Sequence, residues 1–228
     1  MVHVLVVHHS MMGHTARAAE RLVEGVRSVS DVRCTSKPVA ADGVDPAATA
    51  TREDFRDADA LVLGCPVHQR GPSWEMKRFI DLHCEPSWFW DDMVGRVGGV
   101  FATGGGHGGA GGGAELAQLG LLANLASLGL ILVTHPKTTP GFDVAGMHWG
   151  PQIRTGGLKL EADLPDGMDP QALESLFHYG AAVARVTRAL RRGAEGERLM
   201  PLGNVSPAPP AREARHQQDG SSPIGEPR

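Results

Sequence analysis

VHVLVVHHSMMGHT, residues 2–15, passes from an apolar run typical of a buried strand to a turn that contains serine, glycine and threonine. The apolar residues that follow recur at the i, i+3, i+4, i+7 spacing of one helix face: Ala16, Ala19, Leu22, Val23 and Val26. A buried strand that leads directly into an amphipathic helix is the first part of a parallel β-α-β unit. This stretch therefore predicts an α/β fold.

The same pattern returns along the chain. Short apolar or β-branched runs predict strands over residues 2–8, 31–36, 60–65, 97–102 and 129–134. Stripes with helical spacing come between or after them: Met76, Phe79 and Ile80; Leu116, Leu119, Leu122, Leu125 and Leu128; Leu173, Leu176, Phe177, Val183 and Val186. Because strands that alternate with helices are joined by right-handed crossovers, we expect a five-stranded parallel sheet with helices on both faces.

The composition is that of one ordinary globular domain. Of the 228 residues, 41% are hydrophobic and 21% are charged, and the formal net charge is -4. A nucleic-acid surface would need a basic excess that this sequence lacks, so we expect no nucleic-acid partner. We expect a folded domain over residues 1–198 and a disordered tail over residues 199–228, where proline, serine and charged residues replace apolar periodicity.

The sequence carries no signal for export or for a membrane. The chain enters its first strand at Val2 without a basic and then apolar leader, and no uncharged apolar run is long enough to cross a bilayer. Cys34, Cys65 and Cys84 are widely spaced and form no CxxC pair, which argues against a disulfide framework and a zinc site. We therefore expect a cytoplasmic protein with no membrane span and with reduced thiols in its core.

Three loops follow the first, third and fourth predicted strands. In a sheet of this kind a ligand binds outside the carboxyl ends of the strands, where the winding reverses direction. The loops at that edge are residues 10–15, 66–71 and 103–113, and all three are rich in glycine, proline, hydroxyl-bearing or other polar residues. This placement predicts where the site lies before any motif is considered.

The first loop has the features of a monophosphate cradle. Ser10 and Thr15 can donate hydroxyl hydrogen bonds, and Gly13 lets the backbone approach an anion at the positive end of the following helix. No GxxxxGK[ST] or GxGxxG pattern is present, which excludes a nucleoside-triphosphate loop and a dinucleotide fingerprint. The alternative is an ordinary turn in which Ser10 or Thr15 caps the helix.

The histidines near this loop raise the question of a metal. Strand alternation sends His8 and His9 to opposite faces, and no carboxylate or cysteine stands at a supporting spacing. We therefore expect packed or hydrogen-bonded histidines and no metal site. His14 is expected in the first turn of the helix, close to the bound group.

The other two loops suit a planar ligand. In PVHQRG, residues 66–71, Pro66 stiffens the strand exit and polar side chains can meet a ligand; the nearby Trp74 and Met76 are expected in the core. In TGGGHGGAGGG, residues 103–113, the missing side chains would let the main chain lie along a ring edge. A surface loop without ligand contacts is the alternative for the glycine stretch. The aromatic cluster over residues 88–92 suits a pocket, a subunit interface or the core.

The loops together resemble those of flavodoxin-like FMN proteins, and specifically those of the WrbA-type NAD(P)H:quinone oxidoreductases. The resemblance covers about residues 2–195 and is carried by VLVVHHSMMGHT (4–15), GCPVHQRGPSWEMKRFID (64–81), GRVGGVFATGGG (95–106) and DVAGMHWGP (143–151). It implies a flavodoxin-like three-layer sandwich with strand order 2-1-3-4-5, non-covalently bound FMN, and a homodimer or homotetramer whose subunits share active sites.

The loop chemistry and the resemblance together predict the site residues. FMN contacts are expected from Ser10, Met11, Met12, Gly13, His14, Thr15, Pro66, Val67, His68, Gln69, Arg70, Gly71, Thr103, Gly104, Gly105, Gly106, His107 and Gly108. Substrate contacts are expected from Met12 and from Trp88, which stands where the family has a tryptophan facing the flavin. The chain departs from the family at Met12, in place of an aromatic residue, and at His68 and Gln69, in place of an arginine and an aromatic residue.

The implied activity is transfer of electrons from NAD(P)H, through FMN, to a quinone or similar planar acceptor. FMN carries the redox chemistry, so no protein nucleophile is expected. Two alternatives remain at this stage: a flavodoxin-type electron carrier and a non-catalytic FMN-binding regulatory protein.

Overall fold

The computed structural model describes residues 1–105, 111–156 and 167–194. The predicted contacts Gly106, His107 and Gly108, and the predicted tail over residues 199–228, lie outside the described residues. The helices are α1 (His14–Arg27), η1 (Pro46–Ala48), α2 (Arg52–Arg56), α3 (Trp74–Phe79), the π-helix η2 (Ile80–Cys84), α4 (Glu85–Phe89), η3 (Gly111–Gly113), α5 (Ala114–Ser127), α6 (Phe142–Ala145) and α7 (Pro170–Gly193).

The sheet has the predicted order. Its strands are β1 (Val2–His8), β2 (Val32–Pro38), β3 (Ala60–His68), β5 (Val97–Gly104) and β6 (Ile131–Leu132), which pair in parallel as β2-β1-β3-β5-β6. This is the order 2-1-3-4-5 of the expected fold. Two further strands make the described sheet seven-stranded: β4 (Gly71–Pro72) is antiparallel to β3, and β7 (Gln152–Arg154) is parallel to β5. With two and three residues, they are too short to leave a periodic pattern.

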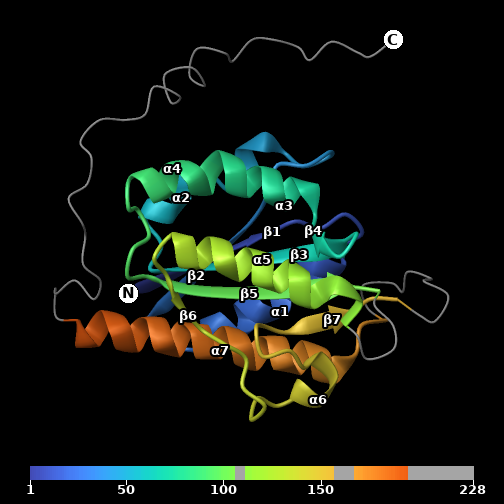
Figure 1. Cartoon of the computed structure of the whole chain (residues 1–228). Helices are drawn as coiled ribbons and strands as arrows, with labels where there is room; N and C mark the ends of the chain where they lie inside the picture. The colour runs from blue at the N-terminus through green and yellow to red at the C-terminus, as the bar shows by residue number, and fades with distance from the viewer. Residues whose placement is uncertain (106–110, 157–166, 195–228) are drawn as a thin grey trace, which may run out of the picture.

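Helices cover both faces of the sheet, which gives three layers (Figure 1). Alternation in β1 sends Val4 and Val6 to the face covered by α1 and α7, and Leu5 and Val7 to the face covered by α3 and α5. Each face therefore has its own apolar core, and both cores are closed by residues from sequence-distant elements. The fold is the predicted flavodoxin-like α/β sandwich.

Helices α1 and α7 pack backbone against backbone. A Cβ atom on Gly25 would lie 1.9 Å from the carbonyl oxygen of Phe177, and one on Gly180 would lie 2.2 Å from the carbonyl oxygen of Leu22. The two helices can approach this closely because each contributes a glycine at the crossing. The position of α1 in the sandwich is therefore set by α7.

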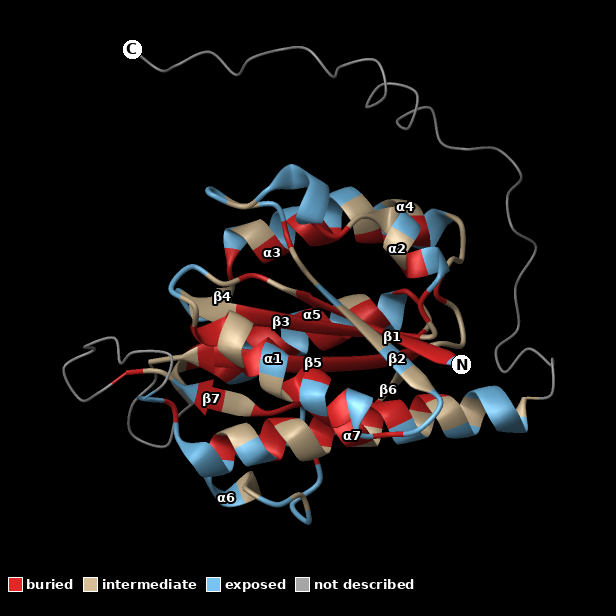
Figure 2. Ribbon diagram, turned by 180° about the vertical axis from the view of Figure 1, so that it is seen from behind, coloured by how far each residue is buried: buried red, intermediate tan, exposed pale blue. Residues whose placement is uncertain are grey.

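Figure 2 shows buried residues in the central strands and many exposed residues on the helices that cover them. Three residues expected to be buried are on the surface. Leu116 and Leu119 are 60% and 40% exposed, because a leucine at every third position drifts around a helix that has 3.6 residues per turn. The side of α5 that packs on the sheet carries instead Ala114, Ala117, Gln118, Leu121, Leu122 and Leu125. Trp74, expected in the core, is 64% exposed at the start of α3, whereas Met76 is buried as expected.

In the described parts of the chain, no helix has the length and apolarity that a membrane span requires. Cys65 and Cys84 are buried, and burial raises the pKa of each thiol to about 12. Cys34, expected in the core with them, is only half-buried.

Candidate functional site

The three predicted loops meet at the carboxyl edge of the sheet, on the right in Figure 1. They enclose a cavity of about 140 Å³. Its walls are Ser10, Met11, Met12, His14, Thr15, Pro66, Val67, His68, Thr103, Gly104, Gly105 and Thr155. Eleven of these twelve residues belong to the set predicted from the sequence, so the loops converge as the parallel topology requires.

The first turn of α1 faces this cavity without a side-chain cap. Gly13 occupies the N-cap position with φ 88°, in the left-handed region, and no side chain accepts a hydrogen bond from the first helical N–H groups. Ser10 Oγ is buried and has no hydrogen-bond partner among the described residues. The alternative in which Ser10 or Thr15 caps the helix is therefore wrong, because Ser10 makes no such bond and Thr15 bonds elsewhere.

Thr15 connects two of the loops. Its Oγ1 lies 2.7 Å from Oγ1 of Thr103, and both residues are almost completely buried. One hydroxyl donates and the other accepts. The accepting hydroxyl keeps its own proton, which can be donated to a further group, and both oxygens have lone pairs directed elsewhere. This hydrogen bond fixes the end of β5 against the first turn of α1.

The second loop is a tight hairpin. Val67 pairs with Pro72 and His68 with Gly71, so Gln69 and Arg70 form a two-residue turn. Both have positive φ, 46° and 70°, which is unusual for side chains of this size. They are exposed and do not line the cavity, whereas His68 does.

The end of the glycine loop rests on this hairpin. Gly113 has φ 97°, and a Cβ atom there would lie 2.5 Å from Cα of Arg70. The second and third loops therefore touch outside the cavity. Gly71 pairs within the hairpin and, like Gln69 and Arg70, contributes to the site by shaping it.

A buried polar cluster that no sequence pattern predicts lies behind His68. His9 is 3% exposed; its Nδ1 lies 2.8 Å from Ser73 Oγ and 3.5 Å from Glu75 Oε2. Ser73 caps α3, accepting a hydrogen bond from the N–H of Met76. His9 is 64 positions from Ser73 along the chain, so only the tertiary fold brings these two residues together.

The histidines pack as the sequence predicts. Burial, together with a smaller effect of the neighbouring His9, lowers the pKa of His8 to about 4. Within residues 1–105, 111–156 and 167–194, no group of three or more histidine, cysteine or acidic side chains could hold a metal ion.

The two predicted substrate contacts lie in different places. Met12 is 56% exposed and stands with Met11 at the rim of the cavity. Trp88, 53% exposed, lines a separate hollow with Asn124 and Ser127, so a single chain does not bring it to the cavity. Thr155 is a wall residue that the sequence reading missed; it follows β7, a strand too short to be predicted.

The donor set fits a phosphate ester such as that of FMN. An uncapped helix N-terminus, a buried hydroxyl without a partner and a left-handed glycine are together what a phosphate oxygen needs. Mostly neutral walls then continue toward Pro66 and Gly104, where a planar group can lie.

Comparison with known proteins agrees with this geometry. Residues 6–136, more than half of the chain, match the family described as NADPH-dependent FMN reductase. A flavodoxin of Aquifex aeolicus is 33% identical over 103 residues, which cover 45% of this chain and 50% of that protein. An NAD(P)H dehydrogenase (quinone) of Solidesulfovibrio magneticus is 29% identical over 118 residues, covering 45% and 58%. This chain thus spans little more than half the length of those relatives.

Solved structures show the same architecture. The flavodoxin, WrbA-like protein from Agrobacterium tumefaciens has a TM-score of 0.62 at 26% identity, over 83% of this chain and 99% of that one. A flavodoxin from the domain Archaea, 14% identical with a TM-score of 0.55 over 82% and 99% of the two chains, shares the fold. The chain belongs to the NADPH-dependent FMN reductase family.

Proposed function

We propose that this protein is a WrbA-type FMN-dependent oxidoreductase that passes electrons from NAD(P)H to a quinone or a similar planar acceptor. The observation that carries the proposal is the cavity at the carboxyl edge, where Ser10 Oγ is buried without a hydrogen-bond partner among the described residues and glycine stands at the N-cap of α1. The name of the Solidesulfovibrio relative supports the choice of acceptor class, and the WrbA-like Agrobacterium structure supports the WrbA type.

The phosphate of FMN would be held by the first loop. Ser10 and Thr15 offer hydroxyls, the residues after Gly13 offer backbone N–H groups, and the positive end of the α1 dipole favours the phosphate charge. The Thr15–Thr103 hydrogen bond keeps the end of β5 in place beside this group. The chain thus binds the anionic end of the cofactor with dipoles rather than with lysine or arginine.

The remaining wall residues would orient the ring and the second substrate. Pro66 and Val67 offer apolar contact, and Gly104 and Gly105 let the backbone approach a ring edge. FMN, once bound, supplies the chemistry by accepting a hydride from NAD(P)H and passing electrons to the acceptor. The exposed Met11 and Met12 at the rim form a flexible apolar surface against which a planar substrate can pack.

Cofactor binding is the first test. Purified protein reconstituted with FMN is expected to show a flavin absorbance spectrum. Ser10→Ala is expected to weaken FMN binding about tenfold, measured by fluorescence titration, because a hydrogen bond to a charged group contributes about 1.5 kcal/mol. Ser127→Ala is the control, since its hydroxyl only bonds the carbonyl of Asn124 on an exposed helix end.

Turnover is the second test. NADH and NADPH oxidation is measured with a panel of quinones, and quinone-dependent oxidation is the expected result. Bound FMN that forms a stable one-electron-reduced state on photoreduction, without NAD(P)H oxidation, would identify an electron carrier instead. Bound FMN with neither property would identify a binding protein, and absence of FMN binding would overturn the proposal as a whole.

We also propose that the protein acts as a homodimer or homotetramer. Trp74, Leu82, Trp88, Phe89, Leu116 and Leu119 are large apolar side chains left exposed on one chain. Light scattering of the FMN-loaded protein measures the assembly, and a monomer would contradict this part of the proposal.

A further inference from the structure

Behind the cavity wall, three ionisable side chains are connected by successive contacts, and this series of side chains is called the row below. His68 ends β3 and lines the cavity, His9 directly follows β1, and Glu75 lies in the first turn of α3. The ring centroids of His68 and His9 are 6.1 Å apart with perpendicular planes, and His9 Nδ1 lies 3.5 Å from Glu75 Oε2. The row leads from the cavity to the interior at the base of α3.

The inner end of this row is a buried carboxylate with little compensation. The Glu75 side chain is 15% exposed, and its Oε2 has no hydrogen-bond partner in the described part of the chain. A carboxylate taken out of water is destabilising unless a partner offsets the loss of hydration. His9, at ion-pair distance, is the ionisable group that the fold places beside it.

Ser73 holds the ring of His9 in place between His68 and Glu75. Its Oγ lies 2.8 Å from His9 Nδ1 and also accepts a hydrogen bond from the backbone N–H of Met76. A proton on His9 Nδ1 therefore points at Ser73 and Glu75, which leaves Nε2 as the ring atom for exchange with His68 or with water between them. A carboxylate that orients a histidine, which in turn faces a reacting group, is a recurring arrangement in acid–base catalysis.

Charges on the neighbouring elements do not replace this carboxylate. Among the residues that the structure describes, the neighbouring titratable or charged groups include His8 in β1, His14 in α1, Lys77 and Arg78 in α3 and Asp81 in η2. Asp81 is paired with Lys77 at 2.6 Å, on the outer side of α3. Burial lowers the pKa of His9, Glu75 partly offsets this effect, and His68 adds to it. Glu75 is thus the neighbour that favours a proton on His9, against burial and His68.

We propose that His68 is the acid that gives a proton to the bound acceptor and that Glu75, through His9, is a positioning residue that keeps this proton on His68. The inference rests on the proposed function. A quinone-like acceptor takes up two electrons and two protons: the hydride brings both electrons and one proton, and the second proton moves from a ring nitrogen of His68 to an acceptor oxygen. His68 is left neutral and is reprotonated from solvent.

Histidine titration by NMR, with ¹⁵N-labelled full-length protein, tests the coupling without any turnover. Glu75→Gln keeps the shape of the side chain and removes its charge. It is expected to lower the titration midpoint of His9 by about 1 pH unit and that of His68 by a smaller but resolved amount. Glu75→Asp, which retains the charge, is expected to restore most of the His68 midpoint.

The chain offers a matched control on its surface. Glu174 lies 3.6 Å from His178 in α7, and the two side chains are 52% and 36% exposed. Glu174→Gln is expected to shift only His178, by less than about half a pH unit, because exposed pairs at this spacing interact weakly. It should leave His9 and His68 unchanged.

The pH dependence of acceptor reduction tests the donor. The rate constant is expected to fall as pH rises through the His68 midpoint measured by NMR, and Glu75→Gln should move both midpoints together. His68→Gln is expected to lower this rate about 100-fold and to remove the inflection. Glu174→Gln should change neither rate nor inflection.

Two results would overturn the inference while the proposed function stands: a His68 midpoint that is the same in Glu75→Gln, or a rate profile that does not follow the His68 titration. A protein that binds FMN but does not oxidise NAD(P)H would instead overturn the proposed function, and with it the donor role. The NMR titrations, recorded on both FMN-free and FMN-loaded protein, separate these cases.

Discussion

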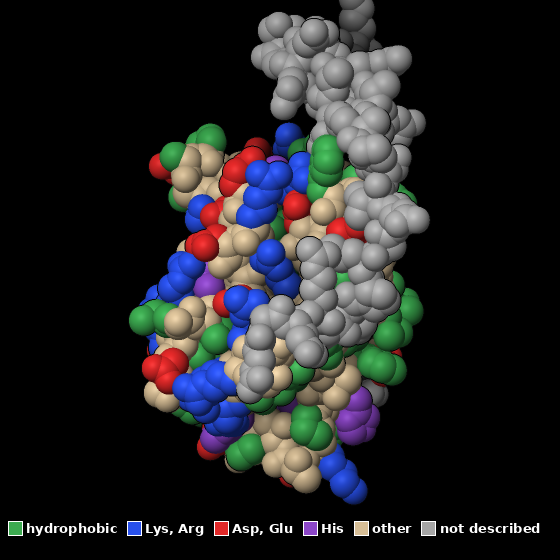
Figure 3. All heavy atoms as spheres, turned by 90° about the vertical axis from the view of Figure 1, so that its left-hand side faces the viewer, with side chains coloured by type: hydrophobic (Ala, Val, Ile, Leu, Met, Phe, Trp, Pro, Cys, Tyr) green, Lys and Arg blue, Asp and Glu red, His purple; other side chains and the backbone are tan. Residues whose placement is uncertain are grey.

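The hollows at the two edges of the sheet differ in volume and in the charge of their walls. The amino edge holds the larger hollow, about 550 Å³, lined by arginine and aspartate side chains, and Figure 3 shows basic and acidic groups interspersed on that face. The carboxyl edge holds only about 140 Å³ among mostly uncharged walls. The cavity predicted as the site is therefore smaller than the charged hollow at the amino edge.

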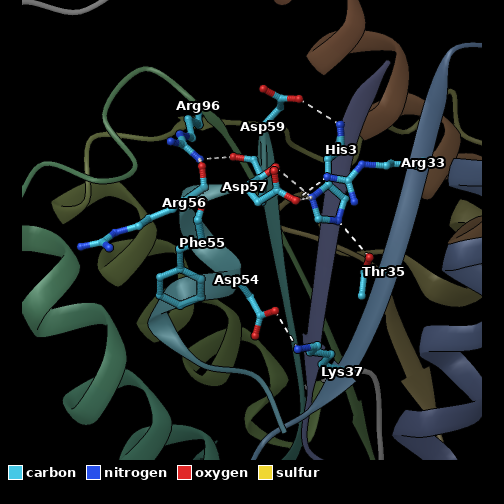
Figure 4. Close-up of polar contacts among 11 residues, drawn as sticks. His3, Arg33, Thr35, Lys37, Asp54, Phe55, Arg56, Asp57, Asp59 and Arg96 are labelled. Carbon is cyan, nitrogen blue, oxygen red and sulfur yellow. Dashed lines mark hydrogen bonds and ion pairs between the residues drawn. The ribbon is translucent and has the colours of Figure 1, made fainter. Parts of the chain in front are cut away.

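The difference lies in how the polar groups are satisfied. At the amino edge, Figure 4 shows His3 bonded through its backbone N–H to Asp59 and through its ring to Thr35 and the carbonyl of Asp57. Arg33 pairs with Asp57, and Arg96 donates to three carbonyl groups around the end of α2. At the carboxyl edge, Ser10 Oγ and Glu75 Oε2 are buried without such partners. The polar groups at the amino edge are already hydrogen-bonded within the chain, which indicates a structural role. The unpaired polar atoms at the carboxyl edge can still bind a ligand, which indicates the site.

Arg96→Met, at the amino edge, should have the largest effect, and this effect should be on stability and not on FMN affinity. Its guanidinium bonds the carbonyl oxygens of Phe55, Arg56 and Ala58, so the substitution is expected to lower the free energy of unfolding by about 2 to 3 kcal/mol, measured with urea. FMN affinity should stay within about twofold, because the cavity is at the other edge. Arg192→Met, which removes an exposed pair with Asp31, is the control and should leave stability unchanged. A loss of FMN binding in Arg96→Met would contradict the separation.

Gly13→Ala should act at the carboxyl edge. Its φ of 88° disfavours a Cβ atom, and a displaced turn would misalign the N–H groups that face the cavity. FMN affinity is expected to fall about 30-fold, equivalent to about 2 kcal/mol, in a fluorescence titration. Gly43→Ala is the matched control: its φ is 77° and nothing lies within 4 Å of the added Cβ, so it should lose stability without losing FMN affinity.

His8 should make the carboxyl edge sensitive to acid. Burial holds the pKa of His8 at about 4 in the folded chain, below the 6.5 of an ordinary histidine, so the unfolded state binds the extra proton between these values. Stability therefore falls as pH falls from 6.5 toward 4. In His8→Asn the loss between pH 6.5 and 4.5 is expected to be smaller by about 1 kcal/mol, a figure discounted for partial exposure.

Urea unfolding at several pH values measures this difference. His178→Asn, on the surface of α7, serves as the control. An acid dependence that is identical in wild type and His8→Asn would show that His8 does not produce it.

Gln69→Asn should have the smallest effect. Gln69 has φ 46° in the hairpin turn, a conformation that asparagine tolerates better than glutamine. The substitution is expected to stabilise the fold by about 0.5 kcal/mol in urea unfolding. Gln171→Asn, in the first turn of α7, should give no gain, and a gain of equal size there would remove the turn as the explanation.

The sequence predicted what local pattern controls. The run over residues 2–8 and the stripe from Ala16 to Val26 are each long enough to show their period, and both elements formed where expected. Since parallel strands bring their carboxyl ends to one edge, the convergence of Ser10, Pro66 and Thr103 was also predictable. The leucines of α5 misled because spacing by three does not match the helical period, so Leu116 and Leu119 face outward.

What the sequence could not predict depends on contacts between distant residues. His9 meets Ser73 and Glu75 only after β1 and α3 are packed on the same sheet. Thr155 reaches the cavity because the three residues of β7 add to β5, and a strand of that length has no signal of its own. Trp88 matched a family position in the chain, yet the fold of one chain places it beside Asn124 and Ser127 instead.

The glycine crossing of α1 and α7 has a consequence for how the protein is made. The residues that face the cavity from the first loop are synthesised some 165 residues before Gly180, which lies at the crossing with α1. Until α7 docks, the apolar face of α1 has only the sheet to pack on, because the α7 side of this core is missing. We therefore expect nascent chains that end before Pro170 to be unable to capture FMN, so cofactor loading would follow the docking of α7.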